Sequence, residues 1–136
     1  IENYIPANNR SQLMVRNEVE IILDAYNANP SSMAAALAHF SALDKPKKVA
    51  VLGDMFELGA ESLSEHKNII ELMGGRPEIE TWFIGKDFFT NKTAHSHLHF
   101  FENFEDFSTS FHKGEARMIL IKGSRGMALE RTLDLL

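Results

Sequence analysis

Short apolar runs that alternate with helical patterns constrain the fold of this chain more than any other feature. The runs at residues 49–52, 82–84 and 118–121 are continuous, which is typical of strands buried on both faces. Helix-forming segments lie between them, so the sequence predicts βαβ units and a mainly parallel sheet. Residues 100–101 suggest a further short strand. Residues 11–26 are rich in β-formers around a polar turn, and they predict a hairpin with one antiparallel edge strand.

Capping residues and apolar spacing predict the helices between these strands. Ser31 or Ser32 can cap the first helix. The second begins near residues 62–64 and ends at the glycine pair 74–75, where a left-handed cap is expected. Asn103 can cap a third helix, which runs from residue 104 to about 111, and the last helix is expected from about residue 127 to the end.

Composition and charge narrow the class of protein. The chain has 136 residues, which suggests one domain. With 14 basic and 19 acidic residues its net charge is −5, so we expect no nucleic-acid partner, since binding of a duplex needs phosphate neutralisation. There is no cysteine, which excludes disulfides, thiolate zinc sites and cysteine nucleophiles.

The ends of the chain and its hydropathy give two further expectations. No apolar run approaches the roughly 18 residues that a membrane span needs, and no signal peptide is apparent, so we expect a soluble, cytoplasmic protein without a membrane partner. The first residue is Ile1 and not methionine, so we expect the chain to be processed or cut from a longer protein.

Three polar clusters follow predicted strands and precede predicted helices. They lie at residues 24–30, 53–59 and 122–126. In open α/β sheets, ligands bind beyond the carboxyl ends of the strands, so these clusters are the candidate site. The third combines Lys122, Ser124 and Arg125 at a helix start and favours a phosphate or a carboxylate, although a plain surface turn is equally compatible. No Walker A or Gly-x-Gly-x-x-Gly motif is present.

Two aspartates stand out because they end neighbouring candidate strands. Asp24 and Asp54 can hold a ribose hydroxyl, a magnesium-bound water or a ligand ammonium group. The alternative is structural: Asp24 starts an Asx-turn and Asp54 caps a loop. Tyr26 can stack on a base or simply pack.

The alternating histidines His95, His97 and His99 resemble a metal-ligand pattern. No nearby carboxylate or cysteine completes a set, so we expect a solvated loop or edge strand and assign no metal ligand. The dense group of phenylalanines between residues 88 and 111 is expected to pack in the core.

Together the three clusters resemble the C-terminal domain of the Mur ligases. The resemblance rests on Asp-Ala-Tyr-Asn-Ala-Asn-Pro at 24–30, Leu-Gly-Asp-Met-Phe-Glu-Leu-Gly at 52–59 with His66 downstream, and Lys-Gly-Ser-Arg at 122–125. They occur in the family's order and at about its spacing. The Tyr-Asn-Ala-Asn form is most similar to family members that add D-alanyl-D-alanine to UDP-N-acetylmuramoyl-tripeptide.

This resemblance implies the fold and the reaction. Residues 1–136 would form a single Rossmann-like three-layer α/β domain, without the N-terminal UDP-sugar domain and the central P-loop ATPase domain of the full enzyme. ATP would convert a substrate carboxylate to an acyl phosphate, which the dipeptide amine attacks, in peptidoglycan precursor synthesis. Mg²⁺ ligands would lie mostly in the central domain, and the isolated chain is expected to be inactive.

The resemblance also implies roles for individual residues. The expected catalytic residues are Arg10, although Asn9 precedes it where the family usually has glycine, and Lys122. The residues implied in ATP binding are Arg10, Asp24, Tyr26, Asn27 and Asn29. The residues implied in substrate binding are Asn29, Asp54, Glu57, His66, Ser124 and Arg125.

Two alternatives remain open from the sequence. The chain can belong to another Mur ligase or a folylpolyglutamate-type ligase, or it can be a non-catalytic α/β module that binds a nucleotide or a partner protein. An upstream P-loop in the same reading frame would favour a ligase.

Overall fold

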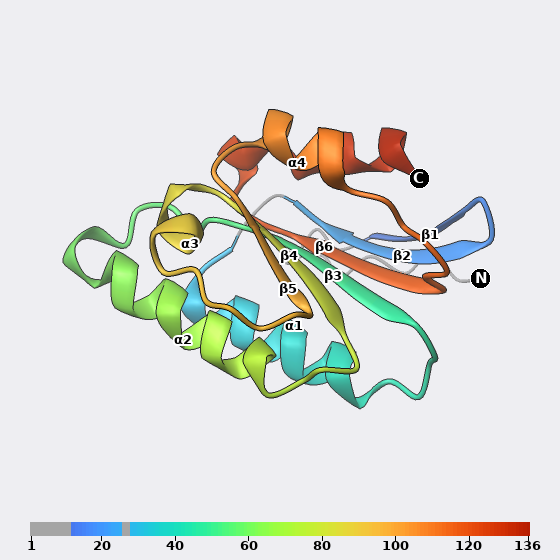
Figure 1. The fold of residues 1–136 in the computed structure, drawn as a ribbon, viewed down its shortest axis with the longest axis horizontal. Helices are drawn as coiled ribbons and strands as arrows, with labels where there is room; N and C mark the ends of the chain where they lie inside the picture. The colour runs from blue at the N-terminus through green and yellow to red at the C-terminus, as the bar shows by residue number, and fades with distance from the viewer. Residues whose placement is uncertain (1–11, 26–27) are drawn as a thin grey trace.

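The polypeptide forms three layers, with one sheet between two helical layers (Figure 1). The computed structural model describes residues 12–25 and 28–136. The sheet contains β1 (Gln12–Arg16), β2 (Val19–Asp24), β3 (Lys48–Gly53), β4 (Glu80–Ile84), β5 (Leu98–Phe101) and β6 (Met118–Lys122). Helices α1 (Pro30–Ala42) and α2 (Ser62–Gly74) cover one face, and α4 (Phe104–Ser110) covers the other with the C-terminal segment. The predicted α/β class is confirmed.

The sheet is parallel except at one edge, as predicted. Its strand order is β1-β2-β6-β3-β4-β5, and only the β1–β2 pair is antiparallel. Asn17 and Glu18 form the turn between these two strands, with φ values of 52° and 69°. Two consecutive left-handed residues are typical of a tight hairpin turn, and asparagine tolerates this conformation well.

The position of β6 corrects one prediction. Asp24 and Asp54 do not follow adjacent strands, because β6 lies between β2 and β3 and pairs with both. Strands that follow one another in the sequence can be separated in a parallel sheet, since each crossover leaves room for a later strand. Lys122 at the end of β6 therefore lies between the two aspartates along the sheet edge.

Side chains of each strand alternate between two apolar layers. In β3, Ala50 and Leu52 pack with Phe40 of α1, whereas Val49 and Val51 pack with Phe107 of α4. The phenylalanines Phe88, Phe107 and Phe111 are buried, which confirms the predicted core role for these members of the group.

The start of α1 differs from the prediction. Asn29 is the cap, not Ser31 or Ser32: its side chain accepts a hydrogen bond from the Ser32 N–H at 2.8 Å, and the Ser32 hydroxyl accepts one from the Asn29 N–H at 3.1 Å. This reciprocal capping box starts the helix at Pro30, whose missing N–H costs nothing in the first turn.

The other helix ends also depart from expectation. Gly75 ends α2 with φ −85°, not in the left-handed region, because its N–H closes a tight final turn on Leu72 O. The C-terminal segment forms two 3₁₀ helices, η2 (Arg125–Met127) and η3 (Leu129–Leu135), and not one α-helix, because Ala128 between them is left-handed at φ 53°. Helix α3 (Lys86–Thr90) was not predicted.

A buried lysine closes the end of α1. The Lys48 ammonium donates to the carbonyl oxygens of Phe40, Ser41 and Leu43 at 2.7, 2.9 and 2.8 Å. These carbonyls lie at the C-terminal end of the helix, where backbone partners become few. The Leu43 N–H also donates to the Phe40 oxygen at 3.3 Å, and the Lys45 N–H donates to the Leu43 oxygen at 3.0 Å. In the part of the chain that the structure describes, no helix has the length and apolar character needed to cross a bilayer.

Candidate functional site

The polar clusters predicted from the sequence meet at the carboxyl edge of the sheet. Asp24 ends β2, Lys122 ends β6, and Asp54 follows β3. The Gly53 and Gly123 backbones touch here, and a Cβ on Gly123 would lie 3.1 Å from the Gly53 Cα. Arg10, Tyr26 and Asn27, three of the predicted nucleotide-binding residues, lie outside the described residues.

Asp24 and Lys122 form a buried ion pair. They are register partners in β2 and β6, and the Lys122 Nζ lies 2.6 Å from the Asp24 Oδ2. Asp24 is 7% exposed and Lys122 is 2% exposed. A charge-assisted bond in such a site holds both groups in one orientation, so the pair fixes a carboxylate and an ammonium at the edge.

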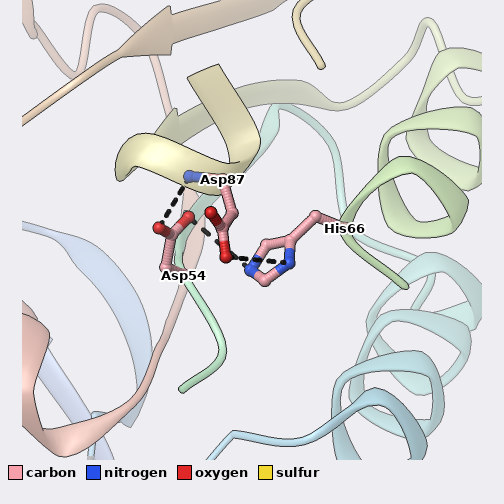
Figure 2. Close-up of side chains that lie close together, drawn as sticks. All are labelled: Asp54, His66 and Asp87. Carbon is pink, nitrogen blue, oxygen red and sulfur yellow. Dashed lines mark hydrogen bonds and ion pairs between the residues drawn. The ribbon is translucent and has the colours of Figure 1, made fainter. Parts of the chain in front are cut away.

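Asp54 ties the loop after β3 to the start of α3 (Figure 2). Its Oδ2 accepts a hydrogen bond from the Asp87 N–H at 2.9 Å, which Figure 2 draws, and its Oδ1 accepts one from the Phe88 N–H at 3.1 Å. Burial raises the pKa of this carboxyl above its usual value, and the two backbone hydrogen bonds oppose that shift. Asp54 therefore caps a helix, close to the loop-capping alternative drawn from the sequence.

Gly85 makes room for this contact. It has φ +133°, and a Cβ at this position would overlap the Asp54 carboxylate. Only glycine adopts this backbone conformation readily and leaves the carboxylate its place.

His66 binds the backbone of the same loop. Its side chain is fully buried, and its Nε2 accepts a hydrogen bond from the Met55 N–H at 2.9 Å. Its Nδ1 lies 2.7 Å from the Ser62 carbonyl oxygen, so this nitrogen must carry the proton. The ring is thus a neutral imidazole with both nitrogens engaged. His66 has no surface for a ligand in this structure, and its predicted substrate role can act only through the loop that it positions.

Asp87 completes a cluster that the sequence analysis missed. Its carboxylate accepts a hydrogen bond from the Ser62 hydroxyl and lies 3.9 Å from His66 Nδ1. The signal was present in Gly85-Lys86-Asp87, which repeats the pattern of strand, glycine and polar residue found after β3 and β6.

The geometry of Asp54, His66 and Asp87 resembles a metal-ligand group, because one donor atom from each lies within 4.8 Å of the others. Both nitrogens of His66 and both oxygens of Asp54 already have hydrogen-bond partners. A cation would have to displace a backbone hydrogen bond, so we interpret the cluster as a structural clasp.

The loop after β3 and the loop after β6 are joined by Ser124. Its hydroxyl accepts a hydrogen bond from the Phe56 N–H at 2.9 Å, and its own N–H donates to the Asp54 carbonyl at 3.3 Å. Ser124 is 7% exposed, so it positions the loop. Glu57, in the left-handed region at φ 66°, and Arg125 are both exposed.

The remaining residues singled out from the sequence hydrogen-bond to backbone groups or to side chains away from this edge. Asn29 is exposed, and its side-chain oxygen caps α1. The alternating histidines do not converge on one point: His97 Nε2 contacts the Met73 carbonyl at 2.9 Å, and His99 pairs with Glu80 at 3.1 Å and stacks on Trp82.

Comparison with known proteins gives consistent matches. The domain described as "Mur ligase, glutamate ligase domain" matches residues 9–125. The UDP-N-acetylmuramoyl-tripeptide–D-alanyl-D-alanine ligase of Treponema pallidum (strain Nichols) is 34% identical over 147 residues, which cover 100% of this chain and 31% of that ligase.

Solved structures agree with the sequence match. A crystal structure of MurF from Acinetobacter baumannii has a TM-score of 0.80 at 27% identity and covers 96% of this chain and 30% of that one. MurF from Thermotoga maritima in complex with ADP has a TM-score of 0.73 at 23% identity, covers 98% and 31% of the two chains, and shares the fold. The chain spans less than a third of the length of the first curated relatives that it matches.

Proposed function

Because this chain belongs to the Mur ligase family, whose glutamate ligase domain it matches over residues 9–125, we propose that it is the C-terminal domain of a D-alanyl-D-alanine-adding ligase. The observation that carries the proposal is its 34% identity, along its whole length, to a ligase of that name. In the proposed reaction, ATP phosphorylates the carboxylate of UDP-N-acetylmuramoyl-tripeptide. The dipeptide amine then attacks the acyl phosphate, an amide forms, and phosphate leaves.

The parent protein would supply the remaining parts. N-terminal and central domains would bind the UDP-sugar and form the P-loop, and this domain would close over the nucleotide and bring in the dipeptide. The substrates and the nucleotide of this reaction are those of cytoplasmic precursor synthesis, so we place the protein in the cytoplasm.

We assign the nucleotide to the part of the sheet's carboxyl edge that lies at the end of β2. Asp24 lies there, and Tyr26, Asn27 and Asn29 follow it closely in the sequence. We propose that these residues and Arg10 bind the phosphate, ribose or base of the nucleotide. A guanidinium at Arg10 suits the charge of a transferring phosphoryl group, and Lys122 holds a second positive charge at the end of β6, next to Asp24. Asp24 and Lys122 hold each other at 2.6 Å, so both are preorganised.

Magnesium fits the described residues of this domain less well than the nucleotide does. Among the described residues, Asp54, His66 and Asp87 form the cluster nearest to a ligand set, and its Asp54 and His66 donors are committed to the backbone. We therefore assign the Mg²⁺ ligands that the reaction needs to the central domain.

We assign the dipeptide to the loop after β3. Asp54, His66 and Ser124 accept four hydrogen bonds, two from the backbone of this loop and two from that of α3, and Glu57 and Arg125 are left exposed. The Glu57 carboxylate is suited to the ammonium end of the dipeptide, and the Arg125 guanidinium is suited to a phosphate or a carboxylate.

Amide NMR of this chain tests whether the nucleotide and the dipeptide bind to separate parts of the site. Titration with Mg-ATP is expected to shift resonances at residues 24–29, and D-alanyl-D-alanine is expected to shift residues 54–59 or 122–125. Shifts from both ligands spread over one shared set of residues would contradict the division.

A ligation assay of the parent protein tests the reaction itself. With UDP-N-acetylmuramoyl-tripeptide and ATP, incorporation of D-alanyl-D-alanine is expected, and glutamate or diaminopimelate should not be used. Incorporation of one of these amino acids in place of the dipeptide would assign the chain to another ligase of the family.

A further inference from the structure

A cavity of about 330 Å³ lies at the carboxyl edge, on the side of β4 and β5. Its wall includes Asp54, Phe56 and Gly85 from the loops already described. It also includes residues that no sequence motif singled out, among them Lys86, Glu102 and Arg131. The cavity therefore extends the site beyond the three predicted clusters.

Arg131 is held rigidly at this wall. Its Nε and Nη2 donate to the carbonyl oxygens of Ala128 and Met127, each at 2.9 Å. The guanidinium carbon lies 4.0 Å above the centre of the Phe104 ring. These contacts fix the plane of the guanidinium, so little side-chain entropy remains to be lost when it binds an anion.

Lys86 adds a second positive charge. It follows Gly85 at the end of β4, and its side chain is exposed. Within residues 12–25 and 28–136, its ammonium group has no hydrogen-bond or ion-pair partner. An exposed lysine and a fixed arginine that line one cavity are suited to a carboxylate, and the apolar Phe56 and Met127 of the same wall are suited to methyl groups.

We propose that this cavity binds the C-terminal carboxylate of the incoming dipeptide, with Lys86 and Arg131 as the residues that recognise it. The inference rests on the proposed function and assigns an orientation to the dipeptide. It also goes beyond the sequence-based expectation, in which Arg125 was a substrate-binding residue in a cluster suited to a phosphate or a carboxylate.

The strand order supports that orientation. Three strand spacings separate β2, which ends at Asp24 of the proposed nucleotide site, from β4, after which Lys86 follows. At about 4.8 Å each, these spacings amount to about 14 Å. An extended dipeptide spans about 7 Å. A carboxylate bound at Lys86 therefore directs the amine along the edge, toward β6 and the proposed nucleotide site. The acyl phosphate would occupy the remaining distance.

The test uses steady-state kinetics of the parent protein with two dipeptides, D-alanyl-D-alanine and D-alanyl-D-alaninamide. Both carry the same nucleophile, and only the first has a carboxylate. The variants are K86M, R125M and the control K67M, which removes an exposed lysine from α2. In K86M, the KM for the free acid is expected to rise about tenfold, because a hydrogen bond to a charged group is lost. The KM for the amide, the KM for ATP and kcat should stay unchanged, and K67M should behave as the wild type.

Each contrary outcome has a separate meaning. An acid-to-amide KM ratio in K86M equal to that of the wild type would overturn the inference and leave the proposed function standing. A ratio that collapses in R125M and not in K86M would also overturn it, and would place the carboxylate at the end of β6. A wild-type protein that does not ligate the dipeptide would overturn the proposed function, and this inference with it.

Discussion

Replacement of Asp54 by asparagine tests whether this carboxylate joins the loop after β3 to α3. In the wild type, its two oxygens accept from the Asp87 and Phe88 N–H groups at 2.9 and 3.1 Å. Asparagine offers one oxygen and turns an NH₂ group toward the other donor, so one backbone N–H loses its acceptor. An unsatisfied buried donor costs about 1–3 kcal/mol, and the lost bond was charge-assisted, so we expect destabilisation of about 2–3 kcal/mol. For a domain of this length that lowers Tm by roughly 10 °C.

Urea unfolding followed by tryptophan fluorescence measures this change. Trp82 is the only tryptophan in the sequence, and it is 6% exposed within the sheet, so its emission reports loss of the core. Asp44→Asn is the matched control, because Asp44 is exposed. Surface substitutions of this kind usually change stability by no more than about 0.5 kcal/mol. If the two variants have the same free energy of unfolding, Asp54 does not clasp the loop as described.

Three further outcomes can be measured in the same way. Because burial raises the folded-state pKa of Asp54, the stability advantage of the wild type over Asp54→Asn should be largest below the ordinary aspartate pKa of 3.8, and it should shrink as pH rises through the folded-state pKa. An advantage that grows with pH would contradict the shift. Gly85→Ala should lower the free energy of unfolding by at least about 2 kcal/mol, because alanine is strained at φ +133° and its Cβ overlaps the Asp54 carboxylate, whereas Gly75→Ala at φ −85° should have little effect. Lys48→Met should cost roughly 1–3 kcal/mol, since the Ser41 carbonyl loses this donor and the Phe40 and Leu43 carbonyls keep only a backbone N–H. The exposed Lys45→Met is its control, and equal unfolding midpoints in urea would argue against the lysine cap.

The strands and the edge that holds the site were predictable, because their signals are local. Continuous apolar runs marked β3, β4 and β6, and the polar residues after them marked the edge of the sheet. Residues 54 and 124 do meet there, with the Ser124 N–H on the Asp54 carbonyl at 3.3 Å.

The features that the sequence analysis missed depend on contacts between distant segments. Helix α3 spans only five residues, too few for an apolar period to be visible. Asn29 and the neighbouring serines are all good caps, and only the geometry of the capping box selects Asn29. His66 reads as a ligand-binding residue from its motif, but its ring is taken up by backbone groups of Met55 and Ser62. No local pattern reveals which backbone atoms will face a ring.

The insertion of β6 between β2 and β3 has a consequence for the order of folding. The Asp24–Lys122 pair joins positions 98 residues apart, and the middle of the sheet is made by the last strand of the chain. During synthesis, β2 and β3 therefore emerge with apolar edges that stay unpaired until residue 122 has left the ribosome. Such long-range closure slows folding, and a nascent chain that stops before β6 cannot complete the sheet. The segment that arrives last is the one that brings the two halves of the proposed site together.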